Sequence, residues 1–112
     1  MKEISWNDFT KVELRVGKII SAGAFPEAHK PAYQLMIDFG DEIGTKKSSA
    51  QITDLYKIDD LPGKLVVAVI NFPPKQIGPL MSECLVTGFY NNEDHVALCI
   101  PDKEVPLGTK LL

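Results

Sequence analysis

Alternation of apolar and polar residues is the clearest pattern in this chain. It is strongest over residues 33–39, where every second side chain is large and apolar: Tyr33, Leu35, Ile37 and Phe39. A period of two places one set of side chains on one face of a β-strand. The segment is therefore predicted to be a strand, and the turn residues Gly40-Asp41-Glu42 are predicted to end it.

The first strand is predicted to begin near Val12, where apolar residues again occupy every second position. Continuing that alternation would place Lys18 among the apolar positions. A β-bulge at Gly17 would turn Lys18 outward and bend the strand, which we expect to run on towards Phe25. A long, bent first strand is typical of a small barrel.

Two short helices are predicted from capping patterns. Ser5 is followed three residues later by Asp8, and Trp6 and Phe9 share one face, which indicates a helix near the N-terminus. Residues 44–47 are predicted to form the third strand. A second capping pattern, Ser48 with Gln51, indicates a short helix that continues to about residue 56.

The second half of the chain is predicted to be mostly strands. Residues 64–70 form an uninterrupted apolar run, which indicates a central strand covered on both faces. A long Pro/Gly loop is expected over 71–82. Two further strands, 84–90 and 95–100, flank a hairpin turn at 91–94.

This order of elements defines the expected fold class. Three strands, a short helix and two or three more strands is the order of the OB-fold, a partly open five-stranded barrel that binds oligonucleotides and oligosaccharides. Residues 1–112 show no repeat or linker. We therefore expect a single all-β OB-fold domain with short helices and terminal extensions, with other small barrels as the alternative.

The position of the charges restricts where a polyanion could bind. The net charge is −3, but residues 1–82 hold equal numbers of acidic and basic side chains, so the acidic excess lies in residues 83–112. A nucleic-acid surface must therefore be local and lie earlier in the chain. Arg15 is the only arginine, which argues against base reading by several arginine forks.

Motifs for chemistry are sparse. The two cysteines, Cys84 and Cys99, lie in apolar runs without metal-ligand spacing, and we expect buried free thiols. The first residues lack a signal-peptide pattern, and no apolar run is long enough to span a bilayer. The expectation is a cytoplasmic binding protein without membrane insertion, catalytic residues, metal or cofactor; a nucleophilic Cys84–histidine pair is the remaining enzymatic alternative.

Binding candidates are easier to find. Lys46 and Lys47 precede the predicted helix that Ser48 would cap, and a helix N-terminus with two lysines suits a phosphate or carboxylate. Arg15 has an alternative interpretation, a surface ion pair with Glu13. Lys18, Lys30 and Lys75 lie far apart in sequence and matter only if the barrel gathers them on one face.

The predicted loop 71–82 offers a second kind of surface. It carries Phe72, Leu80 and Met81 between prolines and glycine. Apolar residues in a long loop either pack on the core or form a contact surface, and methionine adapts to variable partners. Both interpretations are open from the sequence.

A family resemblance adds a ligand class. The opening Asp8-Phe9-x-Lys11-Val12-Glu13-Leu14-Arg15-Val16-Gly17-Lys18-Ile19 resembles that of the tRNA-binding OB-domain family, and Asp38-Phe39-Gly40, Val69-Ile70-Asn71-Phe72 and Val105-Pro106-x-Gly108-Thr109-Lys110 continue the likeness. That family includes the C-terminal domain of bacterial methionyl-tRNA synthetases. Segments 48–52 and 71–74 look like its CsaA branch, homodimeric proteins described as secretion chaperones that also belong to the tRNA-binding class.

The resemblance implies a homodimer that binds tRNA and assists protein export. The implied partners are tRNA, unfolded or exported polypeptides, and the secretion machinery. Lys30 and Ser82 match family positions, whereas Cys84-Leu85 and Gln76 depart from the pattern and keep a polypeptide-binding chaperone with little tRNA binding as the alternative. The expected RNA contacts are Arg15, Lys18, Lys30, Lys46, Lys47, Ser48, Asn71, Lys75 and Ser82. The expected peptide contacts are Phe72, Leu80 and Met81, and the expected dimer contacts are Trp6, Phe9 and Leu111.

Overall fold

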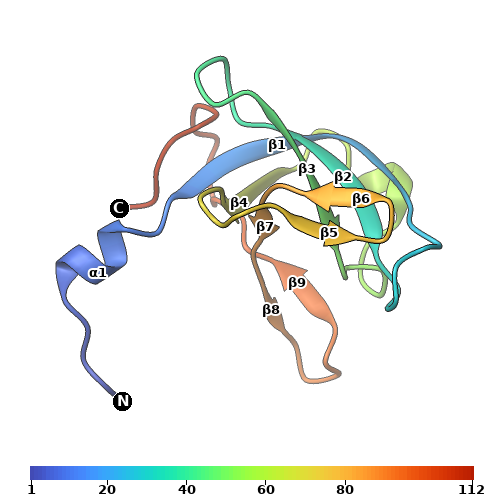
Figure 1. The fold of residues 1–112 in the computed structure, drawn as a ribbon, viewed down its shortest axis with the longest axis horizontal. Coiled ribbons are helices and arrows are strands. Elements are labelled where there is room, and N and C mark those ends of the chain that lie inside the picture. The colour runs from blue at the N-terminus through green and yellow to red at the C-terminus, as the bar shows by residue number, and fades with distance from the viewer.

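A computed structural model describes residues 1–112, which form one short α-helix, one 3-10 helix and nine β-strands (Figure 1). The elements are α1 (Trp6–Thr10), β1 (Leu14–Ala24), β2 (Tyr33–Asp38), β3 (Thr45–Ala50), η1 (Ile58–Asp60), β4 (Leu65–Val69), β5 (Lys75–Ile77), β6 (Leu80–Ser82), β7 (Leu85–Val86), β8 (Gly88–Tyr90) and β9 (Val96–Leu98). None of the helices could serve as a membrane span.

Five strands form a nearly closed antiparallel barrel in the order β3-β2-β1-β4-β7. The two edges meet where β3 passes residues 82–84. There the Glu83 amide donates to the Lys47 carbonyl at 2.8 Å, and the Ser48 hydroxyl donates to the Cys84 carbonyl at 2.8 Å. The predicted all-β, OB-like fold is confirmed.

Strand β1 is long because it serves two neighbours, β4 along its first half and β2 along its second. Its bulge lies between Ile19 and Ser21, so the prediction of a bulge at Gly17 is wrong. Gly17 faces the barrel interior, where an added Cβ would lie 2.5 Å from Ile37 Cγ2. Lys18 is exposed on the opposite face without any bulge.

Val16 is buried although it lies on the same face of β1 as the exposed Lys18, because the C-terminal tail covers it. The Val16 amide donates to the Thr109 carbonyl at 3.0 Å, and the Leu111 amide donates to the Leu14 carbonyl at 2.8 Å. The tail thus extends the sheet beside the first half of β1. Its side chains cover the outer apolar positions of that strand.

The predicted helix after residue 48 is absent. Residues 45–50 continue as β3, and Leu35 of β2 pairs with Ser48. Ser48 is fully buried, so its hydroxyl cannot contact a ligand and its assignment as an RNA contact is corrected. A capping pattern is a local preference, and pairing with a neighbouring strand has overridden it here.

The main core lies inside the barrel and is built on Ile19, Ile37, Phe39 and Val66. Strand β4 is buried on both faces, as its apolar run predicts. Cys84 is buried and Cys99 is partly buried, and both thiols are free.

Two hairpins lie outside the five-stranded sheet: β5–β6 packs across the barrel, and β8–β9 projects from it (Figure 1). The segment predicted as a long loop contains the hairpin β5–β6, called here the arm, which turns at Gly78 with φ of 54°. Leu80 of the arm is buried against Phe25 and Ala32, so its assignment as a peptide contact is also corrected. The predicted hairpin around residues 91–94 is confirmed as β8–β9.

Helix α1 stands away from the barrel, with no buried residue (Figure 1). Its N-terminus is the predicted capping box. The Asp8 amide donates to Ser5 Oγ at 3.1 Å, and the Ser5 amide donates to Asp8 Oδ2 at 3.2 Å. Local hydrogen bonds therefore define the start of this helix, and at its end the Thr10 carbonyl accepts from Lys110 Nζ at 3.0 Å.

Candidate nucleic-acid interface

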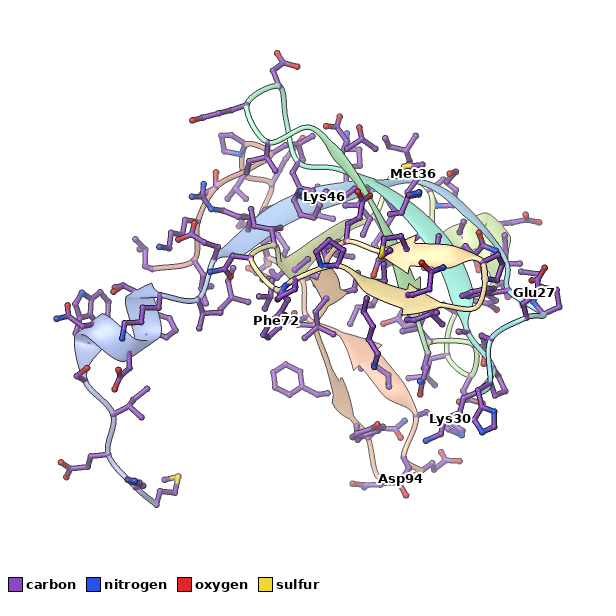
Figure 2. The ribbon with its side chains drawn as sticks, viewed as in Figure 1. Glu27, Lys30, Met36, Lys46, Phe72 and Asp94 are labelled. Atoms are coloured by element: carbon purple, nitrogen blue, oxygen red, sulfur yellow. The ribbon has the colours of Figure 1, made fainter.

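A polar groove of about 520 Å³ lies between loop 27–32, the end of β3 and the arm. Two of the predicted RNA contacts, Lys30 and Lys75, line it together. We call it the basic groove, and its polar lining includes His29, Lys30, Ser49, Gln51, Lys75 and Gln76. Glu27 is its single carboxylate, and Figure 2 shows Glu27 and Lys30 on the same side of the barrel.

A small second core brings the two lysines together. Phe25 and Ala32, at the two ends of the loop, pack against Leu80 of the arm. At the tip of the arm, a Cβ added to Gly78 would lie 3.4 Å from the Glu27 carbonyl oxygen, so the two backbones approach closely. Loop and arm are thereby held against each other, although they are distant in sequence.

Strand β3 supplies the floor of the basic groove. Ser49 lines it, and its amide lies 3.5 Å from Ser82 Oγ. Lys47 lies two residues earlier, on the same face of the strand as Ser49, and lines a different hollow of about 280 Å³ with Met36. Lys47 and Ser82 are therefore close to the groove without lining it.

Arg15 does not join this surface. Its Nη2 lies 2.6 Å from Glu13 Oε1, and its Nη1 donates to the Gly108 carbonyl at 2.9 Å. Lys110 Nζ lies 2.7 Å from the other oxygen of Glu13. These hydrogen bonds, the one from Lys110 first and the one from Arg15 second, lower the pKa of the Glu13 carboxyl below its ordinary value of 4.5. The ion-pair interpretation of Arg15 is confirmed.

Asn71 has a structural role as well. The Glu13 amide donates to its Oδ1 at 3.0 Å, and its Nδ2 donates to the Lys11 carbonyl at 2.7 Å. The side chain thus fastens the segment between α1 and β1 to the end of β4. Asn71 is nevertheless exposed, so its expected contact with RNA stays a prediction.

The remaining two lysines lie elsewhere. Lys18 lines a separate hollow of about 350 Å³ with Lys64 and Lys103, where Asp102 and Glu104 supply opposite charge. Lys46 is opposite Ile37 in the β2–β3 ladder and does not line the basic groove. The barrel therefore gathers only part of the predicted set.

A second hollow of about 360 Å³ adjoins the basic groove and shares Ser49 and Gln51 with it. We call it the aromatic hollow, because Phe89 and Tyr90 line it together with Ile52, Leu85 and Val96. Phe89 is 68% exposed and Tyr90 is 72% exposed. The sequence carried a signal for this surface that we missed: adjacent residues of a strand point to opposite faces, so two neighbouring aromatics cannot both enter one core.

The other predicted contacts are at the surface but apart from the groove. Phe72 is 55% exposed and Met81 is 38% exposed, both on or next to the arm. Figure 2 places Phe72 far from Lys30. On α1, Trp6 is 69% exposed, and its ring centroid lies 5.5 Å from that of Phe9. Leu111 is exposed in the C-terminal tail.

Cys84, the other group with a shifted pKa, lies inside the barrel. Burial raises the pKa of its thiol from 9.0 to about 11. A thiol in this state is a poor nucleophile at neutral pH.

A small barrel with a basic groove beside exposed aromatic rings belongs to the class of oligonucleotide-binding folds. The sequence profile of the putative tRNA binding domain matches residues 14–110. The chain belongs to that family.

Its curated relatives include methionine--tRNA ligases. The enzyme of Pyrococcus abyssi is 39% identical over 108 residues, 96% of this chain and 14% of the enzyme. That of Bacteroides fragilis is 32% identical over 108 residues, 96% of this chain and 16% of the enzyme. The chain thus spans about a seventh of the length of such relatives.

Solved structures resemble the chain over its whole length. The CsaA chaperone protein from Picrophilus torridus has a TM-score of 0.91 at 52% identity, covering 98% of this chain and all of that one. Chaperone CsaA from Bacillus anthracis has a TM-score of 0.92 at 45% identity, covering 99% of this chain and 100% of that one. A MetRS related protein from Pyrococcus horikoshii shares the fold, with a TM-score of 0.87 at 24% identity and full coverage of both chains.

Proposed function

We propose that this protein binds tRNA and holds its phosphate backbone in the basic groove. The observation that carries the proposal is the convergence of Lys30 and Lys75, from two segments distant in sequence, on one polar hollow of a tRNA-binding-family barrel. Lysine ammonium groups bind phosphate as point charges, and Ser49 and Gln51 add hydrogen-bonding groups between them. Lys47 and Ser82 border the same face and extend the proposed contact surface.

The salt dependence of tRNA binding tests this proposal. Each phosphate contact releases counterions, so the slope of log Kobs against log salt counts the contacts. Replacing both Lys30→Ala and Lys75→Ala should reduce the magnitude of that slope by about 2. The matched control is Lys57→Ala, an exposed lysine that does not line the groove, and it should leave the slope unchanged. An unaltered slope in the double variant would place the RNA elsewhere.

The protein is further proposed to act as a homodimer through α1 and the C-terminal tail. The rings of Trp6 and Phe9 pack in a tilted arrangement, 46° between planes, on a helix with no buried residue. Leu111 and Leu112 line an apolar hollow of about 330 Å³ together with Leu14, Val16, Val67 and Ile100. The exposed Trp6, the partly buried Phe9 beside it and an apolar hollow lined by the tail suit burial against a second copy.

Mass in solution tests the dimer. Light scattering at micromolar concentration should give twice the chain mass for the native protein, and Trp6→Ala should shift the mass towards that of one chain. Phe72→Ala removes a comparably exposed aromatic away from α1 and should leave the mass unchanged. A native protein with the mass of one chain would contradict the dimer.

A second candidate function is holding unfolded or exported polypeptide in the cytoplasm, as an export chaperone. The observation that favours it is exposure of Phe72 and Met81 on or next to the arm, together with the likeness to two proteins named CsaA chaperones. We propose Phe72 and Met81 as contacts for apolar side chains of a client.

A titration with a reduced, unfolded polypeptide at two salt concentrations separates the two functions. Polypeptide binding through apolar contacts should persist at high salt, whereas tRNA binding should weaken steeply. Met81→Asp should reduce polypeptide binding and spare tRNA binding. Polypeptide binding that Met81→Asp leaves unaltered would remove the arm from the client site.

A further inference from the structure

We propose that the free edge of residues 85–90 binds an extended segment of unfolded polypeptide as an added β-strand. The inference rests on the proposed polypeptide-holding function and names the feature of the client that the protein recognises, its extended backbone. Three observations carry it: the direction of the backbone groups along β7 and β8, the composition of this edge, and the lining of the aromatic hollow.

The backbone of residues 85–90 forms hydrogen bonds on one side only. At Thr87 the amide donates to the Val67 carbonyl at 3.0 Å, and the carbonyl accepts from the Cys99 amide at 3.0 Å. The amide and carbonyl of one strand residue point the same way. Strand β4 and the end of the β9 segment therefore lie on the same side of residues 85–90.

The backbone groups between these bonded positions point to the opposite side, because only every second residue of an antiparallel strand bonds to a given neighbour. No strand pairs with β7 or β8 on that side, and no backbone hydrogen bond outside the ladders involves the outward residues. These residues are Val86, Gly88 and Tyr90. Their amides and carbonyls are free to bond an added strand, which is the mode of recognition called β-augmentation.

The edge lacks the side chains that protect exposed strands from pairing. Natural edge strands are kept apart by charged residues and prolines, among other devices. Residues 85–90 read Leu-Val-Thr-Gly-Phe-Tyr, with neither a charge nor a proline, and Leu85 is 50% exposed. An edge of this composition pairs readily with another extended chain.

The aromatic hollow gives the added strand its place. All six residues of the edge line the hollow, together with residues 49–52 and Val96. None of the lining side chains is charged, in contrast to the basic groove with its two lysines. A neutral peptide segment fits such a lining, whereas a nucleic acid would place phosphates there without cations to neutralise them.

The two exposed rings favour a strand over a compact ligand. Phe89 and Tyr90 are neighbours on β8, so their side chains leave the strand on opposite faces. The side chains of an added strand alternate between the same two faces and can cover both rings. A compact ligand on one face would leave the other ring uncovered.

Titration of the full chain with a synthetic peptide tests the inference. The probe is a capped, neutral peptide of about seven residues, an ordinary strand length, that alternates valine and threonine. Its matched control has the same side chains but N-methylated backbone amides, which cannot donate. The unmethylated peptide should bind about tenfold more tightly, because the control lacks the backbone hydrogen bonds to the edge.

A pair of variants at one position separates the backbone from the side chain. Tyr90→Pro removes an outward N–H that the ladder with β9 does not use, so the hairpin tolerates it and peptide affinity should fall about tenfold. Tyr90→Val also removes the ring but keeps the N–H, and it should bind the peptide more tightly than Tyr90→Pro. Equal affinities of the two variants would contradict pairing at this residue.

Amide hydrogen exchange of the unaltered protein avoids any effect of the substitutions on folding. Saturation with the peptide should slow exchange at the outward amides of Val86, Gly88 and Tyr90. Unaltered exchange at these amides, or equal affinity of the methylated peptide, would overturn the inference; the polypeptide-holding function would stand if unfolded polypeptide still bound, and would fall with it if none bound. Protection of the same amides by single-stranded RNA, or in the free protein only at high concentration, would assign the edge to RNA or to a second copy and would also overturn the inference.

Discussion

Replacing Gly17 with alanine tests the register of β1, on which the placement of the whole interface depends. An added Cβ at this position would lie 2.5 Å from Ile37 Cγ2 and 2.7 Å and 2.9 Å from two carbons of the Phe39 ring. Both neighbours are fully buried core residues of the barrel. Non-bonded carbon atoms pack at about 3.5–4.0 Å, so one of the side chains must move by about 1 Å.

Opposing effects set the size of the change. Forcing a methyl group into a packed core costs about 1–3 kcal/mol. Replacing glycine also restricts the unfolded chain, which stabilises the protein by about 0.4–1 kcal/mol. We expect Gly17→Ala to lower the free energy of unfolding by about 1–2 kcal/mol.

Urea denaturation followed by circular dichroism, at one fixed protein concentration, measures this difference. The midpoint should fall by about 1 M in the variant. The control is Gly23→Ala on the same strand, where no atom lies within 4 Å of the added Cβ, and stability should stay the same or rise. If Gly17 occupied an outward bulge, alanine would meet open space there as well. Equal stability of the two variants would therefore refute the interior placement of Gly17.

Three further predictions concern single side chains. Ser48→Ala should destabilise the protein by about 1–2 kcal/mol in urea unfolding, because the Cys84 carbonyl loses its shorter hydrogen bond and keeps only the 3.4 Å one from Ser82 Oγ; unchanged stability would contradict the buried hydroxyl. Cys84 should resist alkylation at about pH 8, where a pKa of about 11 leaves roughly a hundredfold less thiolate than the ordinary value of 9.0, whereas the partly buried Cys99 should react first; peptide mapping that shows equal labelling would contradict this. Glu13→Gln should destabilise the protein most near neutral pH. The folded-state pKa of Glu13 is lowered, so the stability from its bond to Lys110 is complete above the unfolded-state pKa and is lost as pH falls through the folded-state pKa. Urea unfolding from about pH 7 to about pH 3 should therefore show the free energies of unfolding of the variant and the native protein converging. A constant difference between the two over this pH range would contradict the prediction.

Elements whose evidence is local were predictable from the sequence. Strand β2 follows from alternation, β4 from its apolar run, and α1 from its capping box. In each case the residues that define the element are neighbours in sequence. The position of the C-terminal tail was not predictable in this way, because the tail pairs with β1, which lies about ninety residues earlier in the sequence.

The helix predicted after Ser48 shows where local evidence fails. Ser48 and Gln51 fit a capping pattern, but Leu35 on β2 offers a paired position inside the barrel. The hydroxyl finds its acceptor on Cys84, far along the chain. A preference within four residues cannot outweigh a ladder of hydrogen bonds and a buried position.

The candidate site, too, was predictable only in part: the sequence identifies its residue types, and the fold decides which of them come together. Lysines were identified as candidates from the sequence, yet nothing local distinguishes Lys30 and Lys75, which converge, from Arg15, which Glu13 holds. The selection depends on Leu80, whose burial holds the arm against loop 27–32.

The sequence by itself determined the all-β class, most strands, the first helix and the membership in a tRNA-binding family, since each rests on periodicity or on contiguous motifs. Only the tertiary structure decided which cations share a groove, which polar side chains are already bonded, and that Phe89 and Tyr90 lie beside that groove. The physical reason is barrel closure, which sets residues distant in sequence within contact distance and leaves each polar group either bonded inside or free for a ligand.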